Sequence, residues 1–243
     1  MISVTPALGA GGRGGLNFSW SPDGNCVNPL VMNQTFACNT NSASFTAVGS
    51  VYLFDADPQF LGLEATISCQ SEGPLPAWWQ SYNSGSCRAT SAMARTTSVS
   101  AGGCRSPWPE TPMGGISAWQ TALNPPPGHV LAANRLLIKV VFVMPTTRLD
   151  LGAGREFNAF QLVLDTNHTV DDPEHGIVAC AGCATGVALT LSTMNLYYDS
   201  NRVDEITQPY HDNCITWQSS AAECWNATPV CNTTWGAIKG FYR

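Results

Sequence analysis

Charged residues and long apolar runs are both scarce in this chain of 243 residues. Only 12% of the residues are charged, and the eleven Lys and Arg residues form no cluster in a chain of formal net charge −6. A surface that follows a phosphate backbone needs concentrated positive charge, so we expect no nucleic-acid partner. The longest apolar run, 136–144, is interrupted by Lys139 and is far shorter than the roughly 20 residues of a spanning helix, so we expect no membrane span.

The familiar catalytic motifs are also missing. The chain contains no Gly-x-Ser-x-Gly, no His-Glu-x-x-His, no P-loop and no dinucleotide-binding fingerprint. Glu64, Glu156 and Asp165 are candidate glycosidase carboxylates, but such a pair is defined by the distance between its carboxyl groups. The histidines, which are too scattered to nominate a general base, are His129, His168, His175 and His211. We therefore expect a protein that is not an enzyme and that carries no cofactor; a secreted hydrolase is the least favoured alternative.

Cysteine, by contrast, is abundant. The ten cysteines are Cys26, Cys38, Cys69, Cys87, Cys104, Cys180, Cys183, Cys214, Cys224 and Cys231. Such a composition is rare in reducing compartments, so we expect these residues to form disulfides and the protein to be extracellular or at the cell surface. Residues 1–4 show neither the cationic start nor the apolar stretch of a signal peptide, so we expect Met1 to lie near a mature N-terminus.

Five Asn-x-Ser/Thr sequons agree with a secreted glycoprotein, although such tripeptides are common by chance in a sequence rich in Asn, Ser and Thr. The candidate sites of glycan attachment are Asn17, Asn33, Asn167, Asn226 and Asn232. They support the prediction of export only weakly.

The motif Cys180-Ala-Gly-Cys183 has the spacing of a redox pair or of half a zinc site, which His211 and Cys214 could complete. A redox pair normally opens a helix, whereas this motif precedes a strand-like segment. We therefore favour disulfides and expect no bound metal. Short-range bridges are candidates, but the full connectivity stays open. The bridges in question are Cys26 with Cys38, Cys87 with Cys69 or Cys104, and Cys224 with Cys231.

The densest acidic stretch contains Asp165, Asn167, Asp171, Asp172 and Glu174, whose side-chain oxygens could bind Ca²⁺. Val170 stands where a calcium loop of the EF-hand type requires glycine. Charge-rich stretches are more often solvated loops, which is the interpretation we favour.

Strand-like segments separated by Gly, Pro, Asn and Ser recur along the chain, and none has a clean helical period. Alternate residues from Leu61 to Ile67 are apolar, as in a half-buried strand, while 135–144 and 157–164 are apolar on both faces, as in covered central strands. This pattern predicts an all-β fold, a disulfide-stapled β-sandwich of jelly-roll type. The predicted strands are 15–20, 35–40, 45–54, 60–69, 135–144, 157–165, 186–198 and 214–218.

We expect one sandwich domain over residues 15–243, with a long insertion at about 71–130. The insertion contains cysteines and tryptophans but little alternation. A structureless loop of this length is uncommon, so we expect it to be cross-linked and to hold short strands or one helical turn near 91–97.

We expect residues 1–14 to form an extended N-terminal segment on a glycine-rich tether. Its first part reads as a short strand, with Ile2, Val4 and Leu8 as candidate assembly residues. A tethered strand of this kind can complete the sheet edge of another copy.

These features predict a non-catalytic extracellular structural subunit, whose partners are copies of itself in a filament, sheath or surface layer built by N-terminal strand exchange. The alternative is a secreted carbohydrate-binding or adhesive module with glycans as partners. Large aromatic residues are more often part of a core than of a sugar-stacking surface. The candidate stacking residues are Trp78, Trp79, Trp108 and Trp119.

The C-terminal half combines Cys180-Ala-Gly-Cys183, the segment 187–196, Ile215-Thr-Trp-Gln218 and a closing Thr234-Trp-Gly-Ala-Ile-Lys-Gly-Phe-Tyr-Arg243. The first half adds Leu16-Asn-Phe-Ser-Trp20, Phe36-Ala-Cys-Asn-Thr40 and Ala77-Trp-Trp-Gln80. In these segments the chain resembles a group of secreted bacterial proteins that have no assigned activity. The resemblance implies export and a common fold, and it implies nothing about a substrate.

Overall fold

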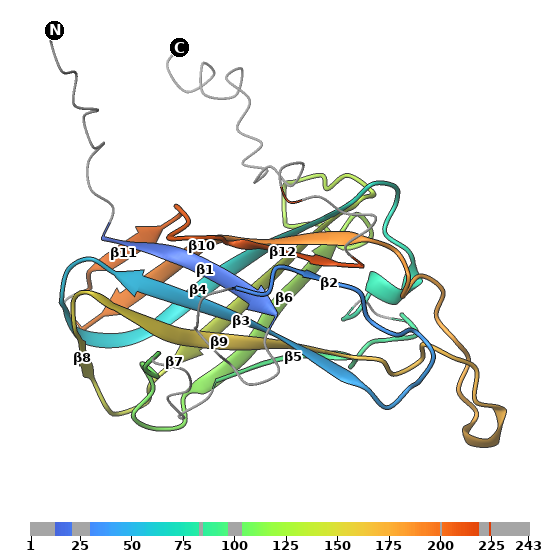
Figure 1. Cartoon of the computed structure of the whole chain (residues 1–243), viewed down its shortest axis with the longest axis horizontal. Coiled ribbons are helices and arrows are strands. Elements are labelled where there is room, and N and C mark those ends of the chain that lie inside the picture. The colour runs from blue at the N-terminus through green and yellow to red at the C-terminus, as the bar shows by residue number, and fades with distance from the viewer. Residues whose placement is uncertain are drawn as a thin grey trace, which may run out of the picture.

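The computed structural model describes residues 13–20, 30–82, 85–96, 104–199, 201–218 and Cys224. Across these residues the chain forms two β-sheets that pack together, with two 3₁₀ turns, η1 (Ala77–Trp79) and η2 (Pro173–His175) (Figure 1). This confirms the predicted all-β sandwich. None of the helical turns in this part of the chain is long and apolar enough to cross a membrane.

The smaller sheet has four strands in the order β1 (Gly14–Trp20), β3 (Ser44–Leu53), β9 (Arg155–Asp165) and β5 (Ala92–Arg95). The larger sheet has eight strands. Its main order is β2 (Asn33–Gln34), β12 (Cys214–Trp217), β10 (Val187–Tyr198), β4 (Asp57–Ser71), β7 (Arg135–Val143) and β6 (Met113–Thr121). In addition, β11 (Val203–Ile206) pairs with β10, and β8 (Leu149–Leu151) pairs with β4. All these pairings are antiparallel except that of β2 with β12.

The alternation predicted for residues 60–69 is present in β4, where Leu63 and Ile67 are buried and Glu64 is half-buried on the other face. A register shift between Tyr197 and Tyr198 of the neighbouring β10 marks an irregularity at the start of β4. There Phe60 is buried and Leu61 is only half-buried, so the expectation that Leu61 faces the core is wrong.

The two strands expected to be covered on both faces differ from each other. Residues 157–164 of β9 are buried without interruption, as predicted. In β7 the burial alternates instead, with Leu136, Ile138 and Val140 buried and the residues between them half-buried. The outer face of β7 is therefore only partly covered.

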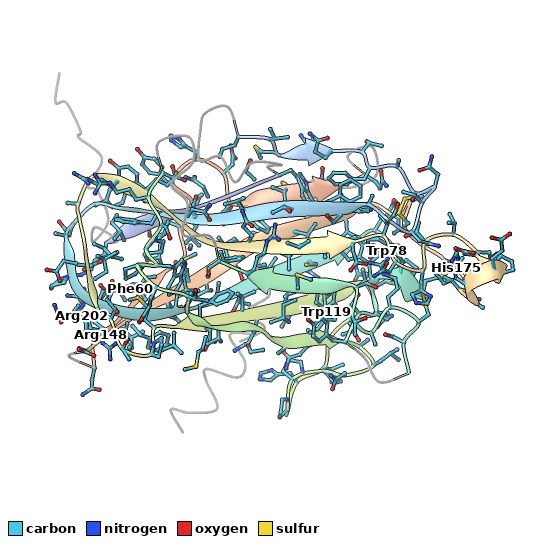
Figure 2. The ribbon with its side chains drawn as sticks, turned by 90° about the horizontal axis from the view of Figure 1, so that it is seen from below. Phe60, Trp78, Trp119, Arg148, His175 and Arg202 are labelled. Carbon is cyan, nitrogen blue, oxygen red and sulfur yellow. A yellow bond between two sulfur atoms is a disulfide. The ribbon has the colours of Figure 1, made fainter. Side chains whose placement is uncertain are left out.

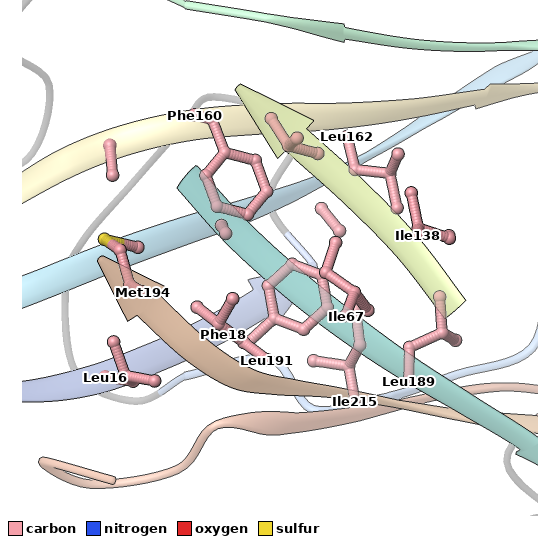
Figure 3. Packing of buried hydrophobic residues seen from close by; sticks show 14 of the residues in the cluster. Leu16, Phe18, Ile67, Ile138, Phe160, Leu162, Leu189, Leu191, Met194 and Ile215 are labelled. Atoms are coloured by element: carbon pink, nitrogen blue, oxygen red, sulfur yellow. The ribbon is translucent and has the colours of Figure 1, made fainter. Parts of the chain in front are cut away.

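Apolar side chains from both sheets meet in one contiguous core (Figure 3). The rings of Phe18 on β1 and Phe160 on β9 lie 6.4 Å apart and face the aliphatic side chains of the larger sheet. Full burial of one such side chain contributes about 1.5–3 kcal/mol, so this layer is a main source of stability. The labelled core residues are Leu16, Phe18, Ile67, Ile138, Phe160, Leu162, Leu189, Leu191, Met194 and Ile215.

The insertion predicted at 71–130 is built into both sheets. Its strand β5 pairs with β9 in the smaller sheet, and its strand β6 pairs with β7 in the larger sheet. The expected short strand near 91–97 is present as β5, whereas the helical turn occurs earlier, at η1.

The strand predicted at 35–40 is absent. The amide side chain of Gln218 hydrogen-bonds to both backbone groups of Phe36. Phe36 N–H donates to Gln218 Oε1 (3.1 Å), and Gln218 Nε2 donates to the Phe36 carbonyl (2.9 Å). The Phe36 ring packs among Trp20, Phe45 and Trp217. A side chain thus takes the place that a neighbouring strand would have at Phe36.

Candidate functional site

Three disulfides lie within the described residues, and two of them join distant parts of the chain. Cys38 is bonded to Cys183 across 145 residues, Cys87 to Cys180 across 93 residues, and Cys214 to Cys224 across 10 residues. The short-range pairs expected for Cys38, Cys87 and Cys224 are therefore wrong. In a chain-entropy model each of the two long-range bridges contributes about 4–5 kcal/mol.

The remaining cysteines differ from one another. Cys69 is free and buried, so the expectation of a disulfide there is wrong; burial raises the pKa of its thiol and keeps it unreactive. Cys104 is disulfide-bonded. Cys26 and Cys231 lie outside the described residues.

The Cys180-Ala-Gly-Cys183 motif is neither a redox pair nor half of a zinc site, since its two cysteines are bonded to different partners. It fastens the segment before β10 to Cys38 on one side and to Cys87 on the other. Among the described residues, no group of three His, Cys, Asp or Glu side chains is arranged to hold a metal ion.

All four candidate stacking tryptophans are buried, with exposed fractions of 1–3%. Trp108 Nε1 donates to the Ala159 carbonyl (2.8 Å), and Trp119 Nε1 donates to the Trp79 carbonyl (3.1 Å). Trp78 is buried at one end of the sandwich (Figure 2). The guanidinium carbon of Arg88 lies over its ring, 3.6 Å from the ring centre. The proposed sugar-stacking surface at Trp78, Trp79, Trp108 and Trp119 is wrong, and the core interpretation is confirmed.

Arg88 holds the loop that follows β9. Its guanidinium donates to the carbonyls of Asp165 and Asn167, each at 2.7 Å. Burial lowers the pKa of Arg88 to about 10, and the charge of Asp165 opposes that shift. The group stays cationic at neutral pH and fixes the base of an arm that projects beyond the sheets, with His175 near its tip (Figure 2).

The acidic residues of this arm bond to its own backbone. Asp171 Oδ1 accepts from Ala179 N–H (2.8 Å), and Asp165 Oδ1 accepts from Asn167 N–H (3.0 Å). Asp172 accepts from the backbone N–H of His175 and pairs with its ring Nδ1 (2.8 Å), and these contacts lower the pKa of Asp172. This arrangement supports a self-capped loop rather than a calcium cage.

Glu64 and Glu156, two of the candidate glycosidase carboxylates, do not face one another. Glu64 lies on the outer face of the larger sheet, where Lys139 Nζ binds it at 3.1 Å. Glu156 lies on the outer face of the smaller sheet, where it accepts hydrogen bonds from Asn17 Nδ2 and Ser50 Oγ. Two carboxylates on opposite faces of a sandwich cannot flank one glycosidic bond.

Asn17 is buried at 1% exposure and both ends of its amide are used. Its Nδ2 donates to Glu156 Oε1 (2.6 Å), and its Oδ1 accepts from His211 N–H (2.9 Å). The expectation of a glycan on Asn17 is therefore wrong for the folded chain. Asn33 and Asn167 are exposed, whereas Asn226 and Asn232 lie outside the described residues.

The start of β1 is fixed by a buried carboxylate. Asp57 has no exposed surface and bonds to Arg13, to Arg202 and to Tyr198 Oη (2.8 Å). The Arg202 guanidinium also lies over the Tyr198 ring, 4.0 Å from its centre. Burial, reinforced by Asp57, raises the pKa of Tyr198 and keeps it a neutral donor. This cluster therefore anchors Arg13, the residue that precedes β1.

One lateral edge of the sandwich, formed by β1 and residues 207–213, is called here the closed edge. The backbone N–H groups of Leu16 and Phe18 donate to the carbonyls of Gln208 and Asp212, and Tyr210 N–H donates to the Leu16 carbonyl, each at 2.8 Å. Tyr210 also stacks on Tyr52 of β3, with ring centres 4.0 Å apart. The backbone of β1 is thus bonded on both sides.

The opposite lateral edge, where β5 and β6 end their sheets and contact each other, is called here the open edge. Within the described part of the chain, no segment other than β7 makes a backbone hydrogen bond to residues 113–120. Met93 and Met113 are 48% and 59% exposed, and Ala94 and Ile116 are only partly buried against the core. The open edge therefore presents both backbone groups and apolar surface.

The candidate assembly residues Ile2, Val4 and Leu8 lie outside the described residues. The boundary placed after residue 14 falls within the sheet, because Gly14 is the first residue of β1. No family model, no curated protein and no solved structure matches the chain.

Proposed function

We propose that this protein is a non-catalytic structural subunit outside the cell, which assembles with copies of itself into a filament, sheath or surface layer. The observation that carries the proposal is the difference in backbone hydrogen bonding between the two lateral edges of the sandwich. The closed edge has its backbone groups bonded within the chain, while residues 113–120 of β6 make no backbone hydrogen bond to the described residues on their outer side. Exposed sheet edges are sites at which chains pair.

The composition of the fold supports a load-carrying role. Two long-range disulfides tie loops together at one end of the sandwich, and Trp78, Trp79, Trp108 and Trp119 are part of its core. Disulfides persist in oxidising surroundings, which supports a location outside the cell and agrees with the resemblance to secreted bacterial proteins. Since the four tryptophans are buried, the carbohydrate-binding alternative loses the surface on which it was based.

The test compares the full chain with a variant that lacks residues 1–12, which keeps Arg13 and β1 intact. We expect the full chain to form extended assemblies in electron micrographs and to sediment as a polymer. The shortened variant should sediment as a folded monomer with unchanged circular dichroism, because it retains the whole described sandwich.

A matched pair of variants separates sequence from length in the N-terminal segment. The substitutions Ile2→Ser, Val4→Ser and Leu8→Ser together should abolish assembly, whereas Thr5→Ser with Ala7→Ser should leave it intact. A full chain that stays monomeric at every concentration, or a shortened chain that assembles as well as the full one, would overturn the proposal.

A further inference from the structure

We propose that the open edge along β6 is the acceptor for the N-terminal segment of a second copy, and that this donor pairs with β6 as an added strand. The inference rests on the proposed function and deepens it by naming the receiving surface and its occupant. It predicts a head-to-tail contact between identical chains.

The first argument is the weak edge protection of β6. Its nine residues, Met-Gly-Gly-Ile-Ser-Ala-Trp-Gln-Thr, include no charged residue and no proline. Natural sheets usually block a long edge with lysine, proline, a β-bulge or a covering segment, and of these the described part of β6 shows only a bulge between Ile116 and Ala118. The closed edge shows that this chain does use a covering segment elsewhere, at residues 207–213. A strand of this length that has no charge, no proline and no covering segment among the described residues therefore indicates an edge at which another chain can pair.

The second argument is the match between donor and acceptor. Residues 2–8 provide seven positions for an acceptor of nine, and Ile2, Val4 and Leu8 share one face of an extended strand. Pro6 cannot donate a backbone hydrogen bond, but proline is tolerated in an outermost strand when its nitrogen faces solvent. The apolar face of the donor would cover the partly buried Ala94 and Ile116 at the seam between the sheets.

The third argument is reach, which favours a second copy over the same copy. Between Leu8 and Arg13 the tether spans at most about 18 Å at full extension. From β1 to β5 there are three strand spacings, about 14 Å, and β6 lies in the other layer, within 8 Å of β5 at this edge. A tether that follows the surface to β6 thus needs about 20 Å, more than its full extension provides.

The positions of the two partners also determine the type of assembly. The donor leaves each copy at the closed edge, where Asp57 holds Arg13, and the acceptor lies at the opposite edge. A contact between two different surfaces repeats from copy to copy, and it forms an open polymer unless the rotation closes a ring. A filament follows from this geometry without a further contact.

The direct test is a cross-link between two separately purified populations of the full chain. One carries Val4→Cys and the other carries Ser117→Cys, and they are mixed under mild oxidation. We expect a reducible dimer that appears only in the mixture, with a linked peptide pair containing residues 4 and 117 identified by mass spectrometry. A chain carrying both substitutions that cross-links only within itself would show same-copy closure and overturn the inference.

A second measurement uses charge at the edge and does not depend on cysteine chemistry. The pair Met113→Lys and Ser117→Lys should raise the concentration needed for assembly about tenfold or more, since lysine blocks edge pairing. The matched control, Leu123→Lys with Val130→Lys, changes two exposed apolar residues outside the strand and should assemble normally.

The outcomes distinguish this inference from the function on which it rests. If the β6 variant assembles normally while loss of residues 1–12 abolishes assembly, the proposed function stands and β6 is not the acceptor. If the β6 variant loses dimers that the shortened chain retains, two β6 edges pair with each other, and the inference is wrong. If neither change affects assembly, both proposals fall.

Discussion

The two lateral edges of the sandwich use their backbone hydrogen-bonding groups in opposite ways. At the closed edge, residues 207–213 run beside β1 and bond to it, and the stacked pair of Tyr52 and Tyr210 holds that segment in place. At the open edge, β6 pairs with β7 on its inner side, whereas on its outer side residues 113–120 have neither a backbone hydrogen-bond partner among the described residues nor a charged side chain. The difference shows that this fold protects one sheet edge and not the other. The exposure of β6 is therefore specific to that strand and is not a general property of the two sheets.

Replacing Asp57 should weaken the closed edge at its start, where Arg13 precedes β1. Asp57→Ala removes a fully buried carboxylate and leaves Arg202 and Tyr198 without their shared partner. Breaking a buried ion pair typically costs 3–5 kcal/mol, and the partial exposure of Arg13 and Arg202 favours the lower end, about 3 kcal/mol. Denaturant unfolding of the chain lacking residues 1–12 measures the change without interference from assembly.

The control for Asp57 is a pair near the same end of the molecule but at its surface. Arg148 binds Asp199, whose side chain is 47% exposed, and Asp199→Ala should cost less than about 1 kcal/mol because solvent screens such pairs. Equal losses for the two variants would show that Asp57 has no special role in fixing the closed edge.

A smaller effect is expected from Gly15→Ala, which should open the closed edge itself. A Cβ at Gly15 would lie 2.8 Å from the Cα of Tyr210, so residues 207–213 must move away. We expect a loss of about 1–3 kcal/mol, as in other overpacked sites, and faster hydrogen exchange of the Leu16 and Phe18 amides. Gly73→Ala is the control because nothing lies within 4 Å of its added Cβ. Unchanged protection of the two amides would mean that other contacts shield β1.

The strands that the sequence predicts correctly are those whose pattern of apolar residues matches their burial in the fold. Residues 157–164 are apolar except for Asn158 and Gln161 and lie buried in β9, and the alternation of 60–69 matches β4 except at Leu61. The strand β6 is missed because Gly114, Gly115 and Ser117 have low strand propensity. Its register is imposed by β7, which no local pattern can reveal.

The failures in the candidate sites have a similar origin. Burial alternates along residues 35–40 as it would in a strand, but Gln218, about 180 residues away, takes the place of a neighbouring strand at Phe36. The bridges of Cys38 and Cys87 likewise depend on which loops the two sheets bring to one end of the sandwich. Sequence alone pairs cysteines that are close in the chain, and this preference for short loops predicts the wrong disulfide partners for Cys38 and Cys87. The burial of the tryptophans, by contrast, follows from the general preference of large aromatics for the core.

The smallest effect should come from Met113→Gln, and it sharpens the comparison because it separates stability from assembly. Met113 is 59% exposed, so in the chain lacking residues 1–12 the substitution should change the free energy of unfolding by no more than about 0.5 kcal/mol. In the full chain the concentration needed for assembly should rise about twofold to threefold, since a donor strand would cover part of this side chain. Leu123→Gln, at an exposed site just beyond β6, should change neither quantity. A surface without a role in pairing would show no difference between the two variants, whereas an acceptor edge should respond to Met113 alone.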